Sequence, residues 1–150
     1  MNPVVRVSEA ASMALHSLVF MAQQPDRSIS VREIIEKLPV SSTHLAKVLQ
    51  RLARQGLLES LRGPHGGFRL ARPADQMTLL EIYEAVDGPL RPGGCVFDHP
   101  ACPAGDCLFG GVLASATRQV RERLGGTRLS DLPMLHHHGG EAVATHDHPD

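Results

Sequence analysis

The sequence has no long apolar run. The segment from Val4 to Phe20 is interrupted by charged and hydroxyl residues, among them Arg6 and Glu9, and no stretch approaches the roughly 20 apolar residues of a membrane-spanning helix. The same interruptions are unlike the apolar region of a secretory signal peptide. We therefore expect a cytoplasmic protein with no membrane partner, in which 150 residues form one compact domain or a small domain with an extension.

Sequence motifs of enzymes are absent as well. Neither Walker spacing nor the glycine spacing of dinucleotide sites occurs, and no Ser/His/Asp or Cys/His pair is placed for catalysis. The chain is therefore predicted not to be an enzyme. Five of its nine histidines fall in a polar tail, residues 136–150, which we expect to be disordered.

Cysteine is scarce, and its three copies are close together. Cys95, Cys102 and Cys107 lie within thirteen residues of a Gly/Pro-rich loop. An odd number excludes a fully paired set of intramolecular disulfides, so we favour a metal or iron–sulfur site completed by a fourth ligand. A thiol switch that responds to oxidants is one alternative. A small zinc- or iron–sulfur-binding protein without a DNA function, with His99 as the fourth zinc ligand, is another.

Positive charge is concentrated in one part of the chain. Residues Arg27 to Arg72 contain nine cations and three anions, whereas the rest of the chain contains six cations and thirteen anions. A basic segment within a near-neutral chain favours a module that binds a polyanion.

Apolar periodicity and caps predict a series of helices. The expected helices span residues 8–24, 30–38, 41–56, 78–86 and 108–124. Ser30 with Glu33 and Thr78 with Glu81 have the spacing of capping boxes. The last helix either closes the core or pairs with a second subunit.

Residues 30–70 have the pattern of a winged helix-turn-helix. Two short helices are separated by Leu38-Pro39-Val40-Ser41, and the second is basic. The Gly-Pro-His-Gly-Gly turn at residues 63–67 then lies between two short apolar-polar runs, which predicts a hairpin whose Arg62 enters a minor groove. The predicted DNA-binding residues are Arg32, Ser41, Ser42, Thr43, His44, Lys47, Gln50, Arg51, Arg62, Gly63, His65 and Gly66.

The hairpin sequence from Gly56 to Leu70, followed by Thr78-Leu79-Leu80-Glu81-Ile82 and three cysteines, resembles the Rrf2 family of bacterial winged-helix regulators. The resemblance covers residues from about 7 to 135. It implies a homodimer that pairs through the long C-terminal helix and binds a palindromic operator in double-stranded DNA. It also implies that Cys95, Cys102 and Cys107 hold a [2Fe-2S] or [4Fe-4S] cluster whose state changes DNA binding.

The resemblance does not supply the fourth ligand directly. Positions that match ligands in two branches of the family are Gly110 and Ser12 here, and neither is an ordinary cluster ligand. Glu9 and His16 lie one turn on either side of Ser12 on the same helical face. The candidates for the fourth ligand are therefore His16, Glu9, Ser12 and His99.

The predicted fold is mainly α with a small β-hairpin wing, a winged helix-turn-helix followed by a long dimerisation helix. We expect a DNA-binding domain over residues 1–88, a cysteine loop over 89–107, a dimerisation helix and cap over 108–135, and the tail over 136–150. The predicted function is that of a transcriptional regulator, a repressor that senses iron, redox state or nitric oxide.

Overall fold

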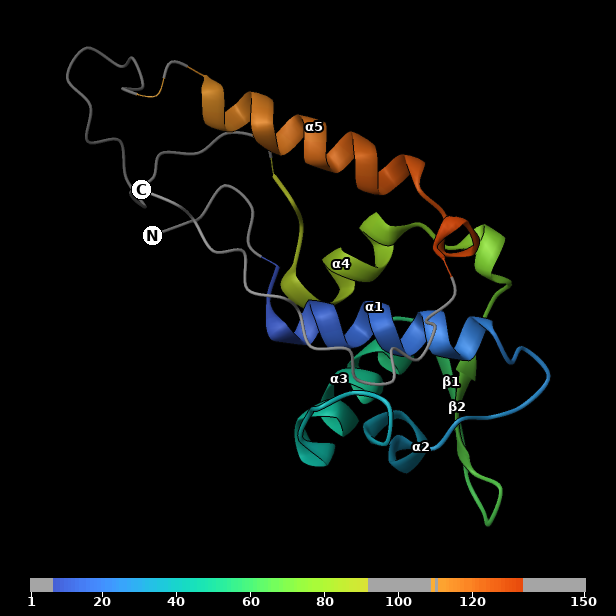
Figure 1. Cartoon of the computed structure of the whole chain (residues 1–150). Helices are drawn as coiled ribbons and strands as arrows, with labels where there is room; N and C mark the ends of the chain where they lie inside the picture. Colours follow the sequence, from blue (N-terminus) through green and yellow to red (C-terminus); the bar gives the residue numbers. More distant parts are fainter. Residues whose placement is uncertain (1–6, 92–108, 110, 134–150) are drawn as a thin grey trace, which may run out of the picture.

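The computed structural model describes residues 7–91, 109 and 111–133 of the chain. The helices are α1 (Glu9–Ala22), α2 (Val31–Ile35), α3 (Ser42–Arg54), α4 (Leu79–Asp87) and α5 (Val112–Gly126), with 3-10 turns η1 (Ala74–Gln76) and η3 (Leu129–Asp131). Strands β1 (Leu58–Leu61) and β2 (Gly67–Leu70) form an antiparallel hairpin (Figure 1). The prediction of a mainly α fold with a small hairpin is confirmed. Within the described ranges, no helix is long and apolar enough to cross a membrane.

The helices begin where the caps predict. The side chain of Ser8 accepts a hydrogen bond from the Ala11 amide, and the capping boxes at Ser30 and Thr78 are both formed. α2 is shorter than predicted, because the amides of Lys37 and Leu38 both donate to the carbonyl of Ile34 and tighten the last turn. The following Pro39 disfavours helical backbone in the residue before it.

The long helix α1 lies between two groups of helices, with α4 and α5 on one side and α2 and α3 on the other (Figure 1). Fully buried side chains from three of these helices, Leu18, Leu49 and Ile82, belong to one hydrophobic cluster. Burial of this apolar surface is the main stabilising term. α1 therefore joins the helix-turn-helix to the C-terminal part of the described chain.

The chain after α5 returns to the core. The amide of Leu129 donates to the carbonyl of Met77 at 2.8 Å, and the amide of Leu79 donates to the carbonyl of Thr127 at 3.0 Å. Leu129 is buried, so the C-terminal end of α5 is fixed to the body of the domain. At its other end α5 begins at Val112, later than predicted, after Gly111 with a φ of +80°.

The hairpin is paired in a regular register from Leu58 opposite Leu70 to Leu61 opposite Gly67. A third segment, residues 28–29, joins the hairpin, because the backbones of Ile29 and Phe68 exchange two hydrogen bonds of 2.8 Å. Gly67 lies against this segment with a φ of +148°, and a Cβ there would lie 2.4 Å from the carbonyl oxygen of Ile29. Only glycine fits this approach of two backbones.

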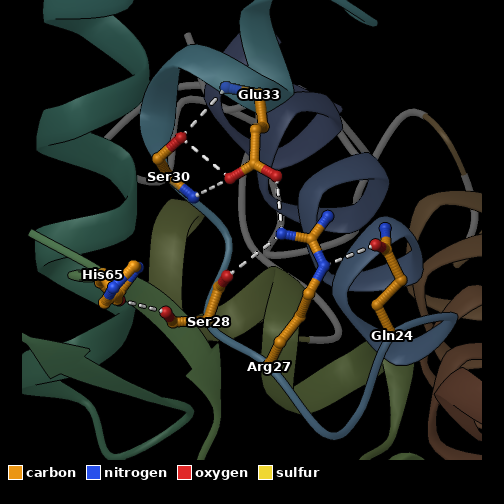
Figure 2. A network of polar contacts seen from close by, with 6 residues as sticks. All are labelled: Gln24, Arg27, Ser28, Ser30, Glu33 and His65. Carbon is orange, nitrogen blue, oxygen red and sulfur yellow. Dashed lines mark hydrogen bonds and ion pairs between the residues drawn. The ribbon is translucent and has the colours of Figure 1, made fainter.

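A polar network holds the segment that pairs with the hairpin (Figure 2). One oxygen of the Glu33 carboxylate accepts from Arg27 at 2.6 Å, and the other accepts from the amide of Ser30 at 2.8 Å. The hydrogen bond from the Ser30 amide, followed by that from Arg27, lowers the pKa of Glu33 to about 2. The ionised carboxylate is therefore part of the folded structure.

This network makes the free energy of unfolding depend on pH in the acid range. The pKa of Glu33 is lower in the folded chain than its ordinary 4.5. The stability contributed by the ionised carboxylate is therefore complete above the ordinary pKa of 4.5 and is lost as pH falls toward about 2. Glu33→Gln removes the titrating group, so its free energy of unfolding should fall less steeply than that of the unaltered chain between about pH 5 and pH 2. Urea unfolding at a series of pH values measures this difference.

Glu36→Gln is the matched control for Glu33→Gln. Glu36 is the C-cap residue of the same helix and makes only a loose, exposed ion pair of 3.5 Å with Arg32. This variant should retain the acid dependence of the unaltered chain. Equal slopes for Glu33→Gln and the unaltered chain would contradict the assignment.

Candidate DNA-binding interface

α3 separates its apolar and polar residues onto opposite sides. Leu45, Val48, Leu49 and Leu52 are buried, as their spacing predicts. They pack α3 against α1, α2 and α4, so the polar side of the helix faces outward. This packing fixes which side chains the helix presents to a ligand.

The outward side of α3 carries hydroxyl, amide and cationic groups and no carboxylate. Of the predicted residues on this helix, Ser42, Thr43, Lys47, Gln50 and Arg51 are exposed and His44 is partly buried. Cations of this kind bind phosphates, while amides and hydroxyls bind base edges. The face therefore has the chemistry of a recognition helix.

The predicted residues before α3 have different surroundings. The side chain of Ser41 is exposed but caps α3 by accepting from the amide of His44 at 3.5 Å. Arg32 on α2 extends into solvent, with 87 % of its side chain exposed and the loose pair to Glu36 as its partner. Arg32 is thus available to a ligand, whereas the hydroxyl of Ser41 has a structural role.

The wing, residues 58–70, extends away from the helices beside α2 (Figure 1). Arg62, Gly63 and His65 at its turn are exposed, and Gly66 is partly buried. Gly66 donates its amide to the carbonyl of Gly63 at 2.9 Å, which closes the turn. The structure therefore presents Arg62 and the turn together at the end of the wing.

Sequence reasoning missed the contacts that attach the wing. The hydroxyl of Ser28 donates to the carbonyl of His65 at 2.7 Å, and Arg27 bonds to the carbonyl of Ser28 and to Glu33. The capping-box spacing identified Glu33, but a capping box predicts only its contact with Ser30. Nothing in the local pattern indicates that Arg27, six residues earlier, binds the second oxygen.

The predicted cluster ligands are divided between described and undescribed parts of the chain. Cys95, Cys102, Cys107 and His99 lie outside the described residues. In the described part, no group of three or more His, Cys, Asp and Glu side chains is arranged to hold a metal. The remaining candidates, Glu9, Ser12 and His16, lie on α1.

The three candidates on α1 differ in exposure. Glu9 and His16 are exposed and Ser12 is partly buried. The Nδ1 atom of His16 lies 2.7 Å from the carbonyl oxygen of Ser12. A carbonyl oxygen only accepts, so Nδ1 is the donor in this contact, and in the neutral ring Nε2 then carries the lone pair. A backbone carbonyl is one of the partners that orient ligating histidines, beside carboxylates and water.

The chain that enters the cysteine segment is tied to the body of the domain. Asp87, at the end of α4, accepts hydrogen bonds from the amide and the hydroxyl of Ser8. The amide of Leu90 donates to the carboxylate of Glu84 at 3.0 Å, and the carbonyl of Leu90 accepts from Arg121 at 2.9 Å. Glu84 and Arg121 also form an ion pair with each other. The entry to the segment therefore contacts α1, α4 and α5.

Comparison with known proteins identifies the family. The Rrf2 family model, described as iron-dependent transcriptional regulator, matches residues 7–134. Protein aau3 of Rhizobium meliloti is 31 % identical over 130 residues, which cover 85 % of this chain and 84 % of that protein. The HTH-type transcriptional regulator BadM of Rhodopseudomonas palustris is 41 % identical over 78 residues, 52 % of this chain and 50 % of BadM. The match thus spans about half the length of BadM.

Solved structures share the fold. CymR, the global cysteine regulator of B. subtilis, superposes with a TM-score of 0.70 at 25 % identity over 85 % of this chain and 95 % of CymR. IscR of T. potens superposes with a TM-score of 0.66 at 23 % identity over 85 % of each chain. The family match, the helix-turn-helix and the wing agree: the chain belongs to the Rrf2 family of DNA-binding transcriptional regulators.

Proposed function

We propose that the chain is a homodimeric repressor that senses iron, redox state or nitric oxide through an iron–sulfur cluster and binds a palindromic DNA operator. The observation that carries the DNA-binding part is the outward side of α3, where cations and amides occur without a carboxylate. α3 enters the major groove, and Arg62 at the end of the wing enters the adjacent minor groove.

The dimer is proposed to form through α5. Phe109 and Val112, before and at the start of this helix, are 52 % and 66 % exposed, so apolar surface remains there for a second subunit to cover. Pairing of two copies about a two-fold axis would cover them and place two α3 helices on successive half-sites, about one helical turn apart. A small change in the angle between subunits then weakens binding to both half-sites.

Cys95, Cys102 and Cys107 are the proposed cluster ligands, and three thiolates are a donor set that suits iron–sulfur clusters. The cluster supplies a centre that reacts with oxidants or nitric oxide. His16 is favoured as the fourth ligand, because Nε2 keeps its lone pair on an exposed face of α1; Glu9, Ser12 and His99 are the other candidates.

The contacts of Asp87 and Leu90 support a route from the cysteine segment to the DNA-binding helices. A change in the segment acts on Asp87, which holds the start of α1, and on Leu90, which Arg121 connects to α5. α1 in turn packs against α3. A change in the cysteine segment would thus reach α5 and the core that supports α3 through direct contacts.

A thiol switch without a cluster is the second candidate. CymR, one of the similar solved structures, is described as a global cysteine regulator, and three thiols in one segment suffice for one disulfide. Formation of that disulfide would act on the same contacts of Asp87 and Leu90.

The DNA-binding proposal predicts separate losses from α3 and from the wing. Lys47→Ala and Arg62→Ala should each weaken operator binding by roughly five- to a hundredfold. Each should also make the slope of log K against log salt concentration shallower, by the amount that corresponds to about one phosphate contact. Fluorescence anisotropy with operator DNA at several salt concentrations measures both quantities.

Arg128→Ala is the control for these two variants. Arg128 is an exposed cation after the end of α5, outside α3, the wing and the proposed dimerisation helix. The affinity of this variant for DNA and its salt dependence should match those of the unaltered chain. Unchanged binding in both Lys47→Ala and Arg62→Ala would reject this interface.

The sensing proposal predicts equal importance of the three cysteines. Cys95→Ser, Cys102→Ser and Cys107→Ser, purified without oxygen, should each lose most of the bound iron and visible absorption, because each removes one thiolate ligand. His16→Ala should alter the spectrum more than Glu9→Ala. A colourless, iron-free unaltered protein overturns the cluster, and an oxidant response that survives loss of one cysteine supports the thiol switch.

A further inference from the structure

We infer that Arg27 and Glu33 are positioning residues of the wing, which hold the hairpin in a fixed orientation relative to α3 and thereby bring Arg62 to the DNA. The inference rests on the proposed role of the wing in DNA binding. Neither residue is assigned a contact with DNA.

The first step is the narrow attachment of the wing tip. Among the described residues, the hydrogen bonds that join the wing tip to the body, beyond those of its own two strands, are the two backbone bonds between Ile29 and Phe68 and the bond from Ser28 to the carbonyl of His65. These contacts all come from residues 28–29. The orientation of the wing tip therefore follows the position of this short segment.

The second step is that one carboxylate holds both ends of the segment. Glu33 accepts from Arg27 just before it and from the amide and hydroxyl of Ser30 just after it (Figure 2). Arg27 also donates to Gln24 at 2.8 Å and to the carbonyl of Ser28 at 3.4 Å. The guanidinium thus joins the end of α1, the segment and α2.

The third step is the fixed relation between α2 and α3. Ile34, next to Glu33, is fully buried, and α2 packs against α3. The side chain of Arg27 is 50 % exposed, so it buries little surface in the core. Its ion pair with Glu33 is partly exposed and stabilises the domain only modestly. Its main effect is to place the segment, while the amide of Ser30 makes the larger contribution to the lowered pKa of Glu33.

A double-mutant cycle tests this inference. Arg27→Ala should weaken operator binding by about five- to tenfold, up to the loss caused by Arg62→Ala, because the wing no longer holds Arg62 at the DNA. In an Arg62→Ala background the Arg27→Ala change should cost much less, because only the smaller contacts of the wing turn remain to be lost. In a Lys47→Ala background its cost should be undiminished, because Lys47 lies on α3.

Two further variants separate positioning from a direct phosphate contact. Arg27→Lys keeps the charge, but its single ammonium nitrogen cannot replace both Nε, which donates to Gln24, and Nη1, which donates to Ser28 and Glu33. It should therefore behave as Arg27→Ala. Glu33→Gln should weaken binding relative to Glu36→Gln, which removes the same charge from the same part of the chain. Rescue by lysine, or equal costs of Arg27→Ala with and without Arg62, would overturn the inference.

A measurement without DNA completes the test. In Arg27→Ala the amides of Ile29 and Phe68 should exchange hydrogen at least about tenfold faster, because local opening of the segment becomes easier. The amide of Leu129, which bonds to Met77 in the core, should keep its rate. Unchanged exchange at Ile29 and Phe68 would overturn the inference. If Arg62→Ala alone leaves DNA binding intact while exchange accelerates, the DNA role of the wing fails and the positioning contacts stand.

Discussion

The backbone pairing between Ile29 and Phe68 is the contact on which the geometry of the binding surface depends. It adds a third segment to a two-stranded hairpin, and an isolated two-stranded hairpin has only marginal stability in water. The pairing requires glycine at position 67, where any Cβ would collide with the carbonyl of Ile29. Without this contact, only the packing of the base of the hairpin against α1 and α3 would hold the end of the wing in place.

α1 supports α3 from the core side and connects it to the C-terminal half of the domain. Its buried side chains contact α3 and α4, and its first residues are held by Asp87 at the end of α4. The sequence therefore uses one helix to support the recognition helix and to hold the entry of the cysteine segment. If the cysteine segment has the proposed sensing role, the switch would need no large rearrangement, because the entry to that segment and the recognition helix α3 both contact α1.

Local patterns were sufficient to predict the helices and the hairpin. Ser8, Ser30 and Thr78 act as caps where their spacing indicates, and the apolar residues of α3 are buried at the predicted positions. The same reasoning placed the end of α2 too late, because the tightened turn after Ile34 depends on the following Pro39. The attachment of the wing was not predictable, since Ser28 and His65 are 37 residues apart and no periodicity relates them.

The ion pairs explain how a segment rich in arginine presents its charge at one surface. Arg27, Arg69 and Arg72 pair with Glu33, Glu59 and Glu81, and Arg32 with Glu36, so four of the nine cations between residues 27 and 72 have carboxylate partners. Among the ion pairs of the described residues, none involves Lys47, Arg51 or Arg62. Carboxylates thus compensate Arg27, Arg69 and Arg72 and only loosely Arg32, while α3 and the wing turn keep their cations uncompensated. A polyanion is attracted to the surface where charge remains uncompensated. This distribution favours α3 and the wing over the rest of the basic segment as the place where DNA binds.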